Sequence, residues 1–309
     1  MKLAFFQGCN IPIRIEQYAV SATAVLERLG VHLEVIDEFT CCGYPVRNVD
    51  EKAYIIPSVR NLAIAEKRGL DIMVICNCCF ASLQKAKNVM AANQALAAEI
   101  NGLLAKDGLT YSGRTAVKHF LTVLHEDIGL DSIKKQLGKV VSDLNLSVIH
   151  GCHVLRPREV TRFDDSFVPR FTDELLALTG AVSLDWRGKL ECCGAALAGL
   201  NSELSEALLN EKVDGALAAG AEFIMPVCSY CHLQFDTTQP AIRQPGSGQQ
   251  VLPVLLLPQL LGLCMGIDEK ILGLEQNTTF QPTHLEQLLP RLGPPVEKKK
   301  KKQKQKAQA

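Results

Sequence analysis

Residues Glu38–Asn48 read EFTCCGYPVRN, and residues Leu190–Gly199 read LECCGAALAG. Each stretch holds two adjacent cysteines followed by a glycine, and the two doublets lie 151 positions apart. When the doublets are aligned, each half shows an apolar strand ending in Gly-Cys, a strand leading to the doublet and a strand ending in Cys-x-x-Cys. Such self-similarity indicates that the chain is an internal duplication.

The cysteine spacing defines the repeat. It is C-x31-C-C-x33-C-x2-C in the first half and C-x39-C-C-x34-C-x2-C in the second. The first set is Cys9, Cys41, Cys42, Cys76 and Cys79, and the second set is Cys152, Cys192, Cys193, Cys228 and Cys231. Cys78 lies inside the first Cys-x-x-Cys pair: the alignment from Phe80 onward favours Cys76 as the site residue, whereas the distance from the doublet favours Cys78. Cys264 is expected to be a small core residue.

The predicted strands alternate with helices. Residues Pro57–Gly69 and Ser202–Gly220 carry apolar residues at helical spacing and end at glycine. Strand–helix–strand units favour parallel sheets, so we predict an α/β fold of two pseudo-symmetric domains at residues 1–100 and 146–296, joined by a helical connector at 101–145. Each cysteine group follows the end of a strand, and five thiols per half should therefore converge at one sheet edge.

Helices are also predicted between and after the repeats. Residues 81–108, 114–129 and 130–137 have helical patterns. The longest apolar run, Val251–Ile267, has 17 residues and contains prolines. It is too short for a typical membrane span. We predict a buried strand followed by a core helix that begins near Pro258, and no transmembrane segment.

Composition limits the class of protein. The chain of 309 residues is 47% hydrophobic and 21% charged, as in ordinary globular proteins. No signal peptide is recognised at its start, so a cytoplasmic protein is expected, in which regular cysteines indicate metal or redox chemistry. Residues 297–309 hold seven of the 33 basic residues and one of the 33 acidic ones. This tail is predicted to be disordered, and the acidic remainder, poor in aromatics, gives no sign of a nucleic-acid partner.

Five thiols per half exceed the needs of a mononuclear site. Four thiolates satisfy one zinc ion or one cubane iron–sulfur cluster. Adjacent cysteines on an extended chain point apart, so they reach two metal atoms more easily than one tetrahedral ion. The spacing therefore favours a multinuclear iron–sulfur site in each half, with zinc as the alternative.

Six short motifs of this sequence resemble those of a known protein family. They are FFQGC, CCGYP, CNCCFASL, HGCHVLRP, ECCGAALAG and CSYCHLQFD. With them the chain, from Met1 to about Ile267, resembles the CCG-domain family of cysteine-rich iron–sulfur proteins, and within it the B subunits of heterodisulfide reductases. The resemblance implies that each five-cysteine set binds a noncubane [4Fe-4S] cluster, and that a disulfide is cleaved or formed between the two. No G-x-G-x-x-G follows a strand in this sequence, so electrons are expected to come from partners. The resemblance implies that these are a ferredoxin-like iron–sulfur C subunit and a flavin-containing A subunit.

Histidines and arginines near the cysteines are further candidates. His153 and His232 directly follow cysteines of the second set and could protonate thiolate products, or else hydrogen-bond sulfur and backbone. Four arginines lie shortly after cysteines of the two sets and could bind a small anionic disulfide or form structural ion pairs; they are Arg14, Arg47, Arg156 and Arg158.

Two other functions remain open from the sequence. One is an electron-transfer CCG subunit of another respiratory oxidoreductase complex. The other is a zinc-binding scaffold that assembles partners. Iron and sulfide content separates the scaffold from the two redox functions.

Overall fold

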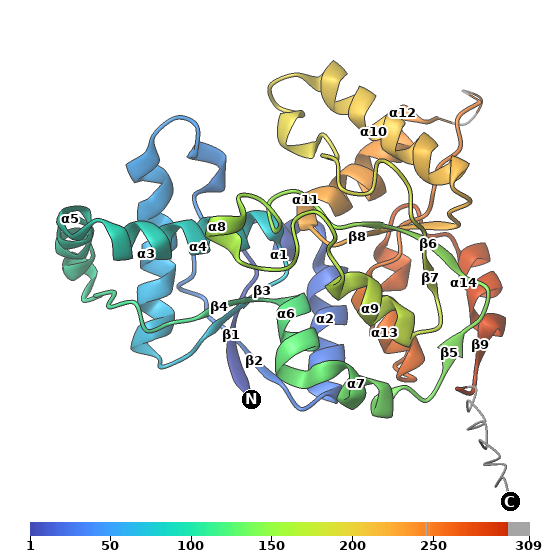
Figure 1. Cartoon of the computed structure of the whole chain (residues 1–309), viewed down its shortest axis with the longest axis horizontal. Helices are drawn as coiled ribbons and strands as arrows, with labels where there is room; N and C mark the ends of the chain where they lie inside the picture. The colour runs from blue at the N-terminus through green and yellow to red at the C-terminus, as the bar shows by residue number, and fades with distance from the viewer. Residues whose placement is uncertain (245, 247, 296–309) are drawn as a thin grey trace, which may run out of the picture.

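The computed structural model describes residues 1–244, 246 and 248–295. The two halves lie side by side, the first on the left and the second on the right of Figure 1. The predicted disorder of residues 297–309 concerns a segment outside the described residues.

The first half is built on a four-stranded parallel sheet with the order β2-β1-β3-β4. The strands are β1 (Lys2–Phe6), β2 (His32–Val35), β3 (Ile72–Val74) and β4 (Val117–His119). β1 pairs with β2 on one side and with β3 on the other, and Ala4 lies opposite Ile72. β3 is wholly buried and apolar, as expected of a parallel strand that is covered on both faces.

The second half repeats the first three of these strands. Its parallel sheet has the order β7-β6-β8, formed by β6 (Asn145–Ile149), β7 (Val182–Ser183) and β8 (Phe223–Pro226). Ile224 of β8 also makes a parallel bridge to Val254. The predicted α/β class with two parallel sheets is therefore confirmed. A short antiparallel pair, β5 (Val140–Val141) and β9 (Leu292–Gly293), lies outside both sheets.

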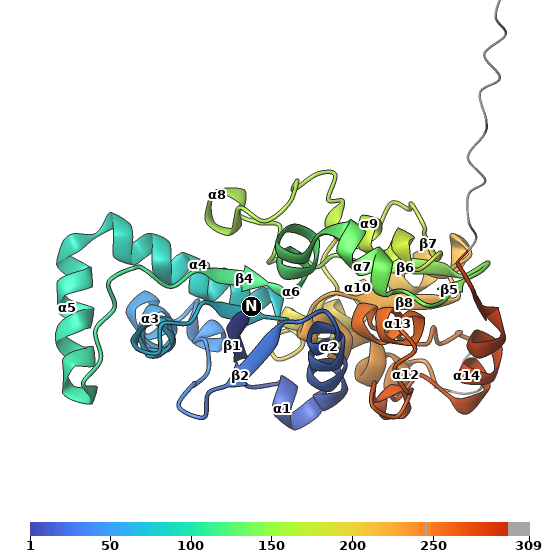
Figure 2. The same ribbon diagram turned by 90° about the horizontal axis from the view of Figure 1, so that it is seen from below.

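Helices fill the connections. Those up to the second sheet are α1 (Ile11–Arg14), α2 (Glu16–Arg28), η1 (Tyr44–Val46), α3 (Glu51–Lys67), α4 (Asn77–Ala92), α5 (Gln94–Leu104), η2 (Ala105–Asp107), α6 (Phe120–Thr122), the π-helix η3 (Val123–Gly129) and α7 (Leu130–Gln136). Those after β6 are α8 (Arg158–Thr161), α9 (Phe171–Leu178), η4 (Ala195–Leu197), α10 (Ser202–Ala218), α11 (Ser229–His232), the π-helix η5 (Leu233–Thr238), α12 (Gln239–Ile242), α13 (Leu257–Cys264), η6 (Leu274–Gln276), α14 (Pro282–Leu288) and η7 (Leu289–Arg291). In Figure 2, α6, α7 and α9 lie on one side of the sheets, while α2 and α13 lie side by side on the other.

The helix after each cysteine doublet shows how closely the halves correspond. α3 and α10 both have 17 residues. The Asp50 side chain caps α3 by accepting the Ala53 N–H at 2.8 Å, and Asn201 caps α10 by accepting the Leu204 N–H at 2.9 Å. Side-chain acceptors at this position satisfy N–H groups that have no partner within the helix. The two caps fix equivalent starting points for the two helices.

The connector differs from its prediction in two places. Residues 81–108 do not form one helix, because Asn93 ends α4 and caps α5 by accepting the Leu96 N–H at 3.0 Å. Residues 114–129 were predicted as a helix, and this is wrong for Val117–His119, which pair with β3 as β4. Tertiary pairing here overrides the local pattern. The domain boundaries at residues 100 and 145 stay a prediction.

The apolar run forms the predicted helix, whereas the predicted strand is reduced to one bridge residue, Val254. Val254 bridges to the second sheet, and α13 begins at Leu257 and is buried along its whole length. Cys264 at its end is buried, as predicted. Within the described part of the chain, no helix is both long and apolar enough to cross a membrane.

Candidate metal centre

The cysteines lie where parallel strands end. Cys76 follows β3 and is the N-cap of α4, and Cys228 follows β8 and is the N-cap of α11. Cys9 and Cys152 follow the central strands β1 and β6 at the same edges. Because the strands are parallel, their carboxyl ends bring these thiols together.

The first set is a connected group of thiols. The sulfurs of Cys9 and Cys41 are 3.9 Å apart. Hydrogen bonds from Cys42 and Cys9 lower the pKa of Cys41 to about 2, and the bond to Cys41 raises the pKa of Cys42 to about 12. Cys79 hydrogen-bonds Cys42 and Cys76, which closes the series. The five predicted residues are thus neighbours.

The second set repeats this arrangement. Hydrogen bonds from Cys152 and Cys193 lower the pKa of Cys192 to about 2, and the bond to Cys192 raises the pKa of Cys193 to about 12. Cys231 hydrogen-bonds Cys193 and Cys228. In both halves, interactions with neighbouring thiols therefore lower the pKa of the first cysteine of the doublet.

The two sets meet between the halves. The sulfurs of Cys76, Cys78 and Cys228 all lie within 4.8 Å of one another, and all three residues are buried. A hydrogen bond with Cys228 is the largest cause that lowers the pKa of Cys76. Cys76 and Cys228 occupy equivalent N-cap positions, so Cys78 corresponds to Tyr230 rather than to a cysteine of the second half.

The structure explains why the third residue of each Cys-Cys-Gly triplet is glycine. Gly43 and Gly194 adopt φ values of +84° and +83°, which residues other than glycine rarely adopt. A Cβ atom at Gly194 would lie 2.6 Å from the carbonyl oxygen of Ser205, and one at Gly43 would meet the carbonyl oxygen of Tyr54. The triplets therefore pack directly on the backbones of α10 and α3. Gly199, which lies five residues after the second triplet's glycine, has open space around it.

His153 lies between the two halves. Its Nδ1 is 3.5 Å from the sulfur of Cys78 and 3.6 Å from that of Cys152. Its Nε2 is 2.6 Å from Nη1 of Arg47. A guanidinium group can only donate, so Nε2 is the acceptor and Nδ1 carries the proton that faces the sulfurs.

Arg47 is fixed by an aromatic ring. The guanidinium carbon lies 4.2 Å from the centre of the Tyr44 ring, and the Tyr44 hydroxyl is 3.2 Å from Nε2 of His153. Tyr44 belongs to the site although the sequence did not single it out; its only signal was its place directly after the first triplet. The other three candidate arginines, Arg14, Arg156 and Arg158, are exposed.

His232 points elsewhere. Its Nε2 is 3.1 Å from the Gln17 amide nitrogen and 3.5 Å from an Asp236 carboxylate oxygen, and no contact with a cysteine sulfur is found in the described part of the chain. Its ring is fully buried, and burial lowers its pKa to about 4. The structure thus brings His153, but not His232, into contact with the thiols.

Side chains cross from the first half to the second around the centre. The Asn77 amide donates to the carbonyl oxygen of His150 at 2.9 Å, and the Tyr18 hydroxyl donates to that of Val227 at 3.0 Å. Tyr230 crosses in the opposite direction and lines the cavity of the first set. These contacts fix the halves against each other at the thiols.

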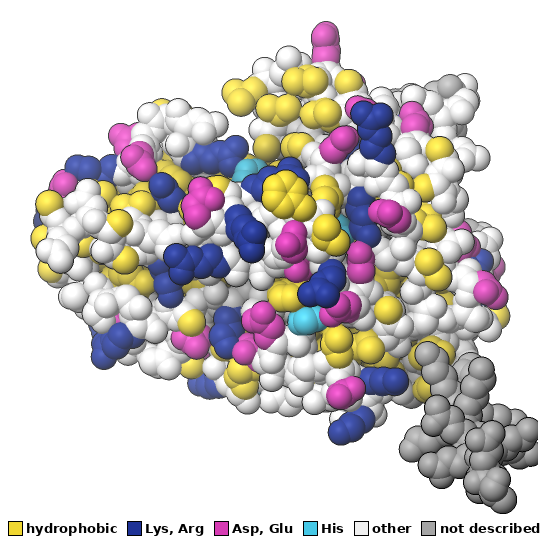
Figure 3. All heavy atoms as spheres, viewed as in Figure 1, with side chains coloured by type: hydrophobic (Ala, Val, Ile, Leu, Met, Phe, Trp, Pro, Cys, Tyr) yellow, Lys and Arg dark blue, Asp and Glu magenta, His cyan; other side chains and the backbone are white. Residues whose placement is uncertain are grey.

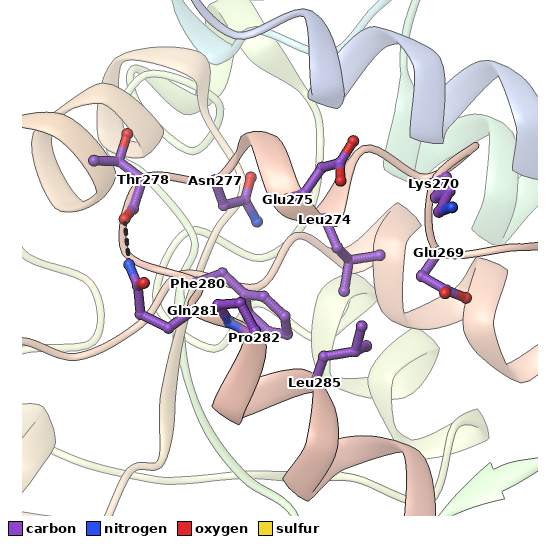
Figure 4. A pocket seen from close by; sticks show the side chains of 10 residues that line it. All are labelled: Glu269, Lys270, Leu274, Glu275, Asn277, Thr278, Phe280, Gln281, Pro282 and Leu285. Carbon is purple, nitrogen blue, oxygen red and sulfur yellow. Dashed lines mark hydrogen bonds between the residues drawn. The ribbon is translucent and has the colours of Figure 1, made fainter.

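A larger surface hollow lies away from the cysteines. It has a volume of about 400 Å³, and its walls include Leu274, Phe280 and Leu285. Figure 4 shows Gln281 donating to the Thr278 carbonyl at its edge. No cysteine or histidine is among the described residues that line it, so it offers no ligands for the expected chemistry.

The donor set suits a metal group. All twelve cysteines are free, and the eleven other than Cys264 belong to the two sets or touch them. Buried thiolates are soft ligands that select zinc or iron–sulfur clusters. The clustered cysteines are consistent with metal binding.

Comparison with known proteins agrees with this. The model of the CCG family, which is described as "Cysteine-rich domain", matches residues 3–84 and 146–236. A protein of Archaeoglobus profundus described as similar to the B subunit of heterodisulfide reductase is 33% identical over 281 residues, which cover 89% of this chain and 94% of that protein. The B subunit of a ferredoxin/F(420)H(2)-dependent CoB-CoM heterodisulfide reductase of Methanosarcina acetivorans is 31% identical, covering 89% and 93%.

Relatives also include a subunit of another kind of complex. The 8-methylmenaquinol:fumarate reductase membrane anchor subunit of Wolinella succinogenes is 30% identical, covering 89% of this chain and 96% of that protein. A hypothetical protein from Helicobacter pylori has a similar fold, with a TM-score of 0.71 and 16% identity over 91% of this chain and 52% of its own. This chain belongs to the CCG family of cysteine-rich domain proteins and is similar to the B subunits of heterodisulfide reductases.

Proposed function

We propose that this chain is the iron–sulfur catalytic subunit of a heterodisulfide reductase-like complex, which cleaves or forms a disulfide between two metal sites. The observation that supports this most is the meeting of the two thiol sets at Cys76 and Cys228, whose sulfurs lie within 4.8 Å of each other. A substrate bound between the halves would touch both sets at once.

Each five-cysteine set would hold one noncubane [4Fe-4S] cluster. The first comprises Cys9, Cys41, Cys42, Cys76 and Cys79, and the second comprises Cys152, Cys192, Cys193, Cys228 and Cys231. When bound, the two clusters supply the two electrons that reduction of a disulfide requires. The equivalent positions of Cys76 and Cys228 support Cys76 rather than Cys78 as the ligand.

The residues between the halves would handle protons and the substrate's charge. His153 holds a proton on Nδ1 between the sulfurs of Cys78 and Cys152, where a thiolate product would need it. Arg47 fixes that tautomer and carries a positive charge suited to an anionic disulfide. His232, the second candidate from the sequence, packs against Gln17 and Asp236, so we assign it to holding α11 in place.

Electrons would come from partner subunits. We infer an iron–sulfur C subunit and a flavin-containing A subunit from the similarity to the B subunits of heterodisulfide reductases. A second candidate function, electron transfer within another respiratory complex, is favoured by the 30% identity to the fumarate reductase protein.

The test is metal analysis followed by turnover. After strictly anaerobic purification, the proposal expects about eight iron and eight sulfide per chain, the content of two four-iron clusters. Replacement of Cys192 and Cys193 by alanine should remove half of each, whereas Cys264→Ala, a change at a buried cysteine outside both sets, should remove none. Two zinc ions and no sulfide would favour the scaffold instead.

Disulfide turnover with an artificial electron donor then separates the two redox functions. Turnover by the iron-loaded chain supports the catalytic function. An iron-loaded chain that passes electrons but reduces no disulfide would support the electron-transfer function.

A further inference from the structure

Lys212 of α10 is a buried lysine without a carboxylate partner among the described residues. Its side chain is almost fully enclosed, at 2% exposure. Its ammonium nitrogen donates to the carbonyl oxygen of Gly188 at 2.6 Å and lies 5.5 Å from the centre of the Trp186 ring. An ammonium group has three donors, and a carbonyl dipole with an aromatic face does not neutralise its charge.

Two other enclosed cations of the described chain are paired with carboxylates. Arg243, at 1% exposure, donates to the Asp214 carboxylate at 2.7 Å, and Lys189 lies 2.7 Å from the Asp173 carboxylate. Within the described ranges, no residue offers Lys212 a carboxylate oxygen within 4.0 Å. Burial of an unpaired charge is costly. Lys212 therefore needs negative charge from another source.

The groups that act on Lys212 electrostatically include thiols of the second set. Burial lowers the pKa of Lys212, and the groups that oppose this most are Cys231 and Cys193, followed by Glu191 and Cys192. Three of these four are predicted ligands of the second site. Gly188, whose carbonyl accepts from Lys212, stands four residues before Cys192, so the lysine is anchored to the loop that leads to the second doublet.

The first half has a neutral residue at the equivalent position. Lys212 stands eleven residues after the cap Asn201, and Asn61 stands eleven residues after the cap Asp50. The Asn61 amide accepts the Thr40 N–H at 2.9 Å and donates to the Thr40 carbonyl at 3.1 Å. The same helix position therefore holds the doublet loop by neutral hydrogen bonds in one half and presents a buried cation in the other.

We propose that Lys212 supplies the counter-charge of the second metal site and raises its reduction potential above that of the first site. This inference rests on the proposed function, since it needs a redox-active group at each site. Reduction adds negative charge to a cluster, and a buried cation stabilises the reduced form. Electrons entering the centre would then settle first at the second site.

The test is a redox titration of the anaerobically purified full-length chain, followed by EPR. Lys212→Met removes the charge and keeps the length, and Lys212→Arg keeps the charge. Lys87→Met is the matched control, because Lys87 is a half-buried lysine that donates to the Thr115 carbonyl and interacts with Asp71 and Glu66 rather than with cysteines. A Cys41→Ala/Cys42→Ala chain, in which only the second set is intact, assigns the signals.

The expected result is that Lys212→Met moves one of the two midpoint potentials to more negative values. That midpoint should be the one retained in the Cys41→Ala/Cys42→Ala chain, and Lys212→Arg should restore it. Loss of metal from the second site in Lys212→Met, but not in Lys212→Arg, supports the same role.

Other outcomes overturn the proposal. Two unmoved midpoints, an equal shift of both, or the same shift in Lys87→Met would show that Lys212 has no specific effect on the second site. Loss of metal in both Lys212 variants would show that its shape, and not its charge, matters. A wild-type chain without iron would overturn the proposed function itself, and this is distinguishable from an iron-loaded chain with unmoved potentials.

Discussion

The loops after the two Cys-Cys-Gly triplets share a backbone and differ in their side chains. Both loops begin with a glycine at positive φ, continue as a 3-10 turn and reach the helix cap seven residues after the glycine. The first loop carries Tyr44 and Arg47, which contact His153 of the other half. The second has the apolar sequence AALAGL, and in Figure 3 hydrophobic side chains gather over η4 and the start of α10. The duplicated loops thus share their backbone conformation and differ in the chemistry of their side chains.

The distribution of positive charge follows the same division. In the first half, the positively charged Arg47 lies at the interface between the halves and contacts His153. In the second half, the positively charged Lys212 is buried and donates to Gly188, in the loop before the doublet. The two proposals assign these cations different roles: Arg47 would meet an anionic ligand, and Lys212 would stabilise a negative metal group.

The shared glycines are expected to give the largest effect. Gly194→Ala should lower the free energy of unfolding by about 3 kcal/mol or more, because the backbone is at positive φ and the new methyl group meets the Ser205 carbonyl. Gly43→Ala should lower the free energy of unfolding by a similar amount. Gly199→Ala, five residues further on in open space, is the control and should change it by less than about 0.5 kcal/mol. Urea unfolding measures all three, and equal stabilities for Gly194→Ala and Gly199→Ala would contradict the packing argument.

The interface histidine should affect turnover rather than folding. His153→Gln removes the proton that faces Cys78 and Cys152, and disulfide turnover should fall about a hundredfold, or ~2.7 kcal/mol. Metal content should be unchanged. His232→Gln is the comparison, and it should lower stability more than turnover per folded molecule, because His232 contacts Gln17 and Asp236. A larger turnover defect in His232→Gln would reverse the assignment.

The sheets and the cysteine sets could be predicted because they are local and repeated. An apolar run that ends in a cysteine, followed by an amphipathic helix, is visible in the sequence twice. β4 could not be found this way, since Val117–His119 are only three residues and gain their strand conformation from pairing with β3. The break at Asn93 is likewise a single capping residue inside a helical pattern.

The contacts between the halves could not be read from the sequence. The approach of Cys76 to Cys228, and of His153 to Cys78, depends on how the duplicated units pack together. Lys212 also gave no signal, because a lysine in an amphipathic helix usually lies at the surface. Its burial results from the packing of α10 on the doublet loop, with Gly188 and Trp186 around the ammonium group.

The free energy of unfolding should depend on pH through a histidine of β4, the strand that only the first sheet has. His119 ends β4 and is fully buried; its Nδ1 accepts the Leu121 N–H, and burial lowers its pKa to about 3. The folded chain keeps this histidine neutral, while the unfolded chain binds a proton below about pH 6.5. The contribution of His119 to the free energy of unfolding should therefore fall as the pH drops from 6.5, by about 2 kcal/mol at pH 5. His232 and His150, whose pKa burial lowers to about 4, add falls of the same sign. His119→Asn, which keeps an acceptor at the cap, should make the pH dependence shallower by this His119 contribution in urea titrations; an unchanged slope would exclude His119 as one of its sources.

The exposed residues of the two loops should give the smallest effect. Val49 and Leu200 occupy equivalent positions and are 84% and 82% exposed. Because neither side chain is removed from water on folding, Val49→Ser and Leu200→Ser should each change the free energy of unfolding by less than about 0.5 kcal/mol. Urea unfolding at two protein concentrations measures this. A loss above about 1 kcal/mol for Leu200→Ser alone, and only at the higher concentration, would mean that the apolar loop is covered by a second copy of the chain in solution, and the difference between the two loops would then extend to assembly.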